Sequence, residues 1–189
     1  STTTADYPQG EAVTADVINA MNNLETNTTD MWRAEMTQTQ TLNDASLNDY
    51  NGISQFSSMS NVSVTKFLEE FGCQGWQSGN RYTYRESTPV TNLFLNLKYL
   101  ISRNGLYSAT DYVSPCYQNG NEVLLKNTYY LPMGFVTDKT ATEYTLEERD
   151  PDDFSNLNTF KKQNEFFTKT TGVSKDVFNI IEPASVNYS

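Results

Sequence analysis

Several residue types that carry common enzyme chemistry are scarce or missing. The chain of 189 residues has no histidine and only two cysteines, Cys73 and Cys116. The lack of histidine excludes Ser-His-Asp and Cys-His catalysis and argues against the usual zinc sites. The cysteines fit no metal-ligand spacing, so they are either free buried thiols or a disulfide, which an oxidising compartment would permit. We therefore expect neither a metal nor another cofactor.

Long apolar runs are missing as well. No stretch approaches the roughly 18 apolar residues that are needed to cross a bilayer, and apolar residues make up only 37% of the chain. Aromatic residues, at 13%, supply large surfaces for burial and indicate a folded protein. The length suits one domain over residues 1–189, and we expect its two ends to be loosely ordered.

The charge balance is strongly acidic. Asp and Glu total 23 against 13 Lys and Arg, which gives a net charge of −10 and makes nucleic acid an unsuitable partner. Asp138–Asp153 is the most acidic segment, whereas Gly79–Arg103 is locally positive. Each segment is either ordinary solvated surface or, in the case of Gly79–Arg103, a surface that faces an anion.

The same Gly79–Arg103 stretch gives the clearest fold prediction. Alternation predicts a strand at Arg81–Arg85, and Thr88 followed by Pro89 is typical of a helix start. Tyr99–Ile101 then suits a buried strand. We predict an α/β fold, a single layered domain with a mixed β-sheet packed with three to four short helices, with α+β as the alternative. The predicted apolar stripe of the helix is Val90, Leu93, Phe94 and Leu97.

Other elements follow from periodicity and turn residues. Met31–Met36 alternates as a strand, and we expect Arg33 and Glu35 to form a cross-strand charge pair on a solvated face. Thr37–Asp49 is predicted to be a long loop. Further predictions are helices at Gly10–Leu24 (buried face Val13, Val17, Met21 and Leu24), from Ser60 or Asn61 to Gly72, and through Leu157, Phe160 and Phe167 to Gly172, a strand at Gly52–Phe56, and a hairpin at Asn119-Gly120.

Aromatic and basic residues gather around the predicted strand at 81–85. Trp76 and Tyr82 lie close in sequence to Arg81 and Arg85. Carbohydrate sites often combine an aromatic face, which packs on sugar C–H groups, with Arg or Asn donors to the hydroxyls. These residues are therefore candidates for a sugar or polymer surface, although the aromatic side chains could equally belong to the core.

Four stretches together resemble the YfhO-type bacterial membrane proteins over roughly residues 30 to 180. They are YNGISQFSSM (50–59), GNRYTYRESTPVTNLFLNLKYLISR (79–103), LLKNTYYLPMGFVTD (124–138) and NTFKKQNEFF (158–167) followed by a Thr-Gly pair. The first places Asn51, Ser57 and Ser58 at a strand-to-helix passage. Their polar groups could bind a sugar or a phosphate, or they could simply cap the helix.

The resemblance implies a soluble extracytoplasmic piece of a large polytopic protein of Gram-positive bacteria. Such proteins are regarded as GT-C-type glycosyltransferases that decorate wall polymers such as lipoteichoic acid. The expected partners are the transmembrane part of the same protein and a wall polymer or lipid-linked sugar, and we expect the piece alone to lack catalysis. The alternative is a binding or architectural module of a membrane protein with another function. A hydrolase using paired carboxylates, such as Glu35 with Glu86, is a third hypothesis.

Overall fold

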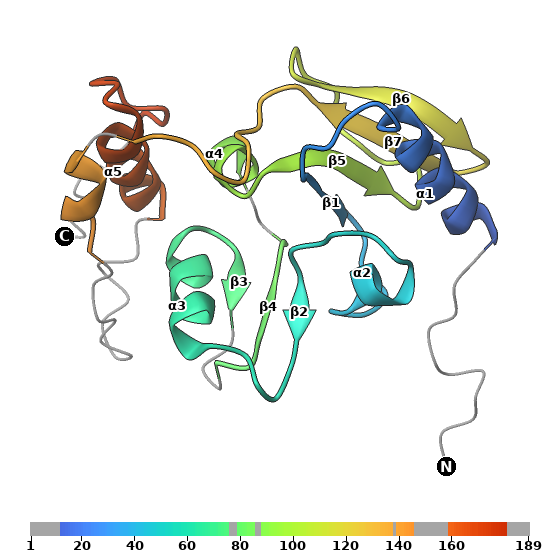
Figure 1. Ribbon diagram of the computed structural model, residues 1–189, viewed down its shortest axis with the longest axis horizontal. Helices are drawn as coiled ribbons and strands as arrows, with labels where there is room; N and C mark the ends of the chain where they lie inside the picture. The colour runs from blue at the N-terminus through green and yellow to red at the C-terminus, as the bar shows by residue number, and fades with distance from the viewer. Residues whose placement is uncertain (1–11, 76–78, 86–87, 138, 146–158, 181–189) are drawn as a thin grey trace, which may run out of the picture.

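The computed structural model describes residues 12–75, 79–85, 88–137, 139–145 and 159–180. It contains a mixed four-stranded sheet, which lies at the upper right in Figure 1. The strand order is β1-β5-β7-β6, with β1 parallel to β5 and the other neighbours antiparallel. The mixed sheet that the sequence predicts is confirmed. Its strands are β1 (Arg33–Met36), β5 (Leu97–Ser102), β6 (Val113–Asn119) and β7 (Glu122–Asn127).

A second, smaller sheet lies below the first in Figure 1. It contains the strands predicted at Gly52–Phe56 and Arg81–Arg85, although their pairing in a separate sheet was not predicted. It is antiparallel, with β4 (Arg81–Thr83) between β2 (Gln55–Phe56) and β3 (Gln74–Gly75). Of its strands, β3 was missed, because two residues carry too short a pattern to be recognised in sequence. Beside this sheet lies α3 (Val62–Glu70), which begins at the predicted Asn61 cap and is followed by Gly72 at a φ of 97°.

The two faces of the large sheet bury different residues. On one face, α1 (Ala12–Leu24) packs against the sheet through Val17, Ile18 and Met21, whereas Leu24, expected on this face, is 54% exposed at the helix end. Other residues of β5 and β7 belong to a second cluster, which also includes Val113 of β6 and two residues that flank the small sheet, Ile53 and Tyr84. That second cluster consists of Ile53, Tyr84, Leu97, Leu100, Val113, Val123 and Leu125.

The helix start at Thr88 is confirmed. The Thr88 hydroxyl accepts from the Thr91 N–H, Pro89 occupies the first turn, and α4 runs over Pro89–Phe94. The predicted stripe fails at its last member, because the backbone turns at Asn96, whose φ is 59°. Leu97 consequently begins β5 rather than ending the helix, and its side chain is fully buried there.

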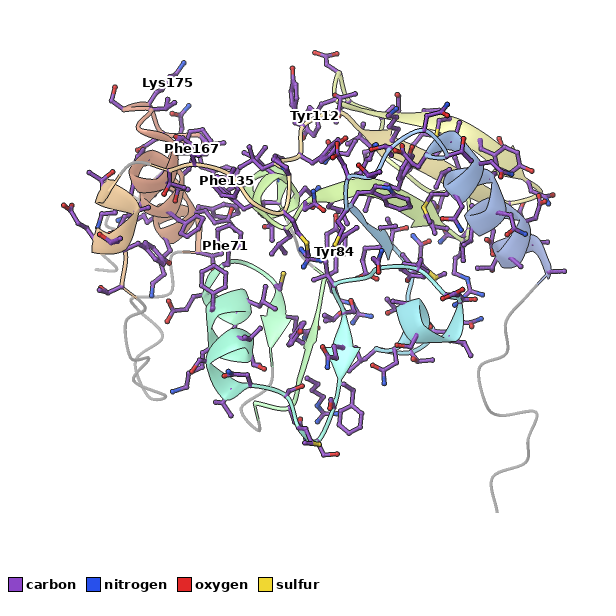
Figure 2. The ribbon with its side chains drawn as sticks, in the orientation of Figure 1. Phe71, Tyr84, Tyr112, Phe135, Phe167 and Lys175 are labelled. Carbon is purple, nitrogen blue, oxygen red and sulfur yellow. The ribbon has the colours of Figure 1, made fainter. Side chains whose placement is uncertain are left out.

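A third core is almost entirely aromatic and joins α3, α4 and α5 (Thr159–Thr171). The ring of Phe166 lies 4.9 Å from Phe71 and 4.8 Å from Phe94, and Figure 2 shows Phe71, Phe135 and Phe167 around the same space. Phe160 lies in α5 as predicted, although it is 48% exposed, and Leu157 lies outside the described residues. A 3₁₀ helix, η2 (Lys139–Glu143), packs beside α5.

Candidate functional site

A polar cavity of about 510 Å³ lies where β1, β2 and a short helix, α2 (Asp44–Leu47), meet. The three elements are neighbours in Figure 1. The helix interrupts the predicted loop over 37–49, because the buried Asp44 carboxylate accepts the N–H groups of Gln40 and Thr41 and folds the loop back. The cavity is lined by Met31, Trp32, Arg33, Asn43, Ala45, Ser46, Tyr50, Asn51, Gly52, Ile53, Ser54, Gln55, Phe56 and Met133.

The segment 51–54 forms the floor of the cavity and runs along the free edge of β1. The Ala34 N–H donates to the Asn51 carbonyl at 2.9 Å, which supplies the edge strand with a partner. Gly52 is required here by close approach, since a Cβ at this position would lie 2.5 Å from the Cβ of Ala45. The floor is therefore fixed from both sides, by β1 and by α2.

Glu35 holds this floor from behind. One carboxylate oxygen accepts the N–H groups of Ile53 at 2.9 Å and Ser54 at 2.8 Å, and the other accepts the N–H of Met36. The expected charge pair of Arg33 and Glu35 on a solvated face is wrong, because segment 51–54 covers this edge and leaves Glu35 only 1% exposed. Burial raises the pKa of Glu35, although the three backbone N–H groups oppose that rise.

Glu35 also influences the titratable groups around it. Burial raises the pKa of Tyr50, and the nearby charges of Glu35 and Asp44 raise it further. Burial and the charge of Glu35 likewise raise the pKa of Cys73 to about 12, so this thiol stays protonated and unreactive at neutral pH. In the hydrolase hypothesis, Glu86 lies outside the described residues, and Glu35 faces backbone amides rather than an open cleft.

Polar groups that remain available for a ligand lie around the cavity wall. Arg33 is half-buried and donates one hydrogen bond, from Nη1 to the Leu95 carbonyl at 3.0 Å. Asn51 is exposed, and its side chain bonds to none of the described residues. Gln55 accepts the Tyr82 hydroxyl at 3.0 Å through Oε1, which leaves its Nε2 free to donate. In the Asn43 side chain, by contrast, both amide atoms bond to the backbone of Phe56: Nδ2 donates to its carbonyl and Oδ1 accepts its N–H.

The structure brings together only some of the predicted binding residues. Asn51 lines the cavity. Tyr82 does not line it, but its hydroxyl donates to the lining residue Gln55. Arg81 pairs opposite Phe56 in the small sheet, while Arg85 lies exposed beyond the end of β4. Ser57 and Ser58 lie in the turn before α3 and do not line the cavity. The Ser57 hydroxyl accepts the Met59 N–H within this turn. Trp76 lies outside the described residues.

Sequence reasoning missed the residues that give the cavity its chemistry. Trp32, Arg33, Tyr50 and Gln55 all line it, and the Trp32 ring meets Tyr99 edge-on with ring centroids 5.3 Å apart. The density of aromatic and amide residues in Tyr50–Phe56 is a signal that could have indicated Tyr50 and Gln55. Trp32 and Arg33 join them only because β1 and this segment are adjacent in space.

The cysteines and potential metal ligands do not form a site in the described part of the chain. Cys73 is a buried free thiol and Cys116 an exposed one on β6, so the disulfide that the sequence permits is not formed. Within the described ranges, no three His, Cys, Asp or Glu side chains gather as a metal ion would require.

Comparison with models of protein families shows to which family the chain is similar. The model of the family described as bacterial membrane protein YfhO matches residues 2–189. The chain belongs to the YfhO family. Its stretch Tyr50–Met59, which carries part of the resemblance noted above, provides half of the residues that line the cavity of this YfhO-family chain. No curated protein and no solved structure matches the chain. Over the described ranges, no helix is both long and apolar enough to pass through a membrane.

Proposed function

We propose that this YfhO-family chain is an extracytoplasmic domain of a membrane glycosyltransferase that decorates wall polymers such as lipoteichoic acid. In this proposal, the cavity binds part of the acceptor polymer and so presents it to the transmembrane part of the same protein. Transfer of the sugar from its lipid carrier is the task of that membrane part. The domain itself binds and positions the acceptor without catalysing the transfer.

The observation that carries the proposal is the composition of the cavity. Asn51 and Gln55 offer amide donors for hydroxyl groups, and Trp32, Tyr50 and Phe56 offer aromatic surface for sugar C–H groups. A cavity of about 510 Å³ is within the usual range for small-molecule sites and can hold one or two units of a polymer. No carboxylate is among the described lining residues, so an anionic polymer meets no direct repulsion there.

Fluorescence of Trp32 tests the proposal. In a Trp76→Phe background, Trp32 is the only tryptophan, and it lines the cavity. Deacylated lipoteichoic acid should change its emission in a saturable way. Replacing both Asn51 and Gln55 by Ala should weaken binding about tenfold, because each free amide contributes a hydrogen bond worth about 0.5–1.5 kcal/mol.

The control exchanges the same residue types on the distant hairpin, Gln118→Ala with Asn121→Ala, both exposed as Asn51 and Gln55 are. These changes should leave binding unaltered. If the polymer does not change the Trp32 emission at all, or if both double variants bind as the parent does, the domain is architectural rather than ligand-binding.

A further inference from the structure

We infer that the ligand of the cavity carries a single negative charge beside its hydroxyl groups, and that Arg33 binds this charge. The inference rests on the proposed function and specifies the ligand class of the same site. It assigns the central role to a residue that the sequence placed in a simple surface ion pair. The contacts of Arg33 are the basis for it.

Arg33 differs from three other sheltered cations of the described chain, each of which has a carboxylate partner. Lys98 forms an ion pair with Glu25, Arg103 with Glu122 and Lys162 with Glu70. Arg33 is also half-buried, yet no carboxylate of the described residues lies within ion-pair distance of it. A partly buried charge is normally paired, and Arg33 lies at a cavity wall without a carboxylate partner among the described residues. Its guanidinium therefore points to an anion bound in the cavity.

The backbone of β1 orients Arg33 toward this cavity. The pairing register between β1 and β5 shifts between Arg33 and Ala34, and such irregularities redirect side chains. The bond from Nη1 to the Leu95 carbonyl anchors one nitrogen and leaves the remaining N–H donors available. A guanidinium can use two parallel donors to bind one carboxylate or phosphate group.

The charge of the cavity wall sets the charge of the ligand. Arg33 is the one ionised side chain among the described lining residues. Glu35 lies behind the wall with its oxygens turned to backbone N–H groups, so it neither binds the ligand nor neutralises Arg33 directly. One cation surrounded by amides and aromatic rings suits a sugar carboxylate or a phosphodiester between polyols. Both place a single anion next to hydroxyl groups.

A matched pair of sugars tests this inference on the Trp76→Phe protein. Methyl glucuronide and methyl glucoside differ in one carboxylate, and glycerophosphoglycerol supplies the phosphodiester alternative. We expect the two charged probes, or one of them, to bind about tenfold more tightly than the neutral glucoside, as the loss of a charge-assisted hydrogen bond implies. Which charged probe binds more tightly identifies the source of the anion.

Substitution of Arg33 completes the test. Arg33→Gln should remove the preference for charge, whereas Arg85→Gln, at an exposed arginine outside the cavity, should keep it. If Arg33→Gln does not fold, Arg33→Lys keeps the charge but lacks the two parallel N–H donors, and it should retain only part of the preference. Binding of both charged probes no tighter than that of the glucoside, or an unchanged preference in Arg33→Gln, would overturn the inference while the proposed acceptor site stands. Failure of every probe and of the polymer would overturn both.

Discussion

Glu35 is the residue on which the geometry of the cavity depends most. It joins β1 to the cavity floor through two N–H groups of segment 51–54, yet it holds a carboxylate in a place that water hardly reaches. Its pKa is raised from the usual 4.5. A raised pKa in the folded state means that folding favours the protonated form. The contribution of Glu35 to stability is therefore fully present below pH 4.5 and is lost as the pH rises through the folded-state pKa.

Glu35→Gln should consequently change how stability depends on pH. Gln keeps one oxygen for Ile53 and Ser54 but turns an amide toward Met36, which adds a cost that does not vary with pH. The free energy of unfolding of the variant, relative to that of the parent, should increase as the pH rises from about 4 to 8. The increase should be about 1.4 kcal/mol for each tenfold difference in the proton affinity of Glu35 between the folded and the unfolded parent. Urea denaturation across this pH range measures it.

Glu143→Gln, at an exposed glutamate, is the control and should follow the parent at every pH. Parallel pH profiles for Glu35→Gln and the parent would contradict the assignment of Glu35 as a buried carboxylate with a raised pKa.

Among the helices, α4 owes its place to a cap that also joins it to another element. The Thr88 hydroxyl accepts the Thr91 N–H and donates to Gln163 Oε1 in α5 at 2.6 Å. Thr88→Ala should lower the free energy of unfolding by about 1–2 kcal/mol, the cost of an N-cap plus a contact between helices. Asn61→Ala removes a cap that makes no such contact and should cost less. Equal losses in urea denaturation would show that the bond to Gln163 contributes nothing.

Elements with local signals could be predicted, and those that depend on distant contacts could not. Thr88-Pro89, Asn61 with Gly72, and Asn119-Gly120 mark starts, stops and turns in the sequence itself, and all three are found. The strands β2 and β4 were predicted in part, but their pairing with β3 and the helix α2 were missed because both depend on partners elsewhere in the chain. Arg33 and Glu35 were misjudged for the same reason, since alternation in β1 cannot reveal that segment 51–54 covers its edge.

On the scale of the whole molecule, the cavity lies where the large sheet, the small sheet and α2 come together. Of the predicted binding residues, Asn51 lines it and Tyr82 supports it from behind, while the exposed Arg85 stands apart. From the sequence we expected aromatic rings with Arg and Asn donors, a combination that the cavity also contains, but assigned most of these residues to β4. Such a site is visible only when strands distant in the sequence are placed side by side.

The most direct test of the central claim is an amide NMR map of the unmodified chain titrated with deacylated lipoteichoic acid. The cavity account predicts that the largest shifts fall on residues 32–33 and 50–56, including the side-chain amides of Asn51 and Gln55, and that the hairpin at 118–121 stays unchanged. The account would be contradicted by shifts centred on Arg81 and Arg85 with no change at the residues that line the cavity, or by no shifts anywhere.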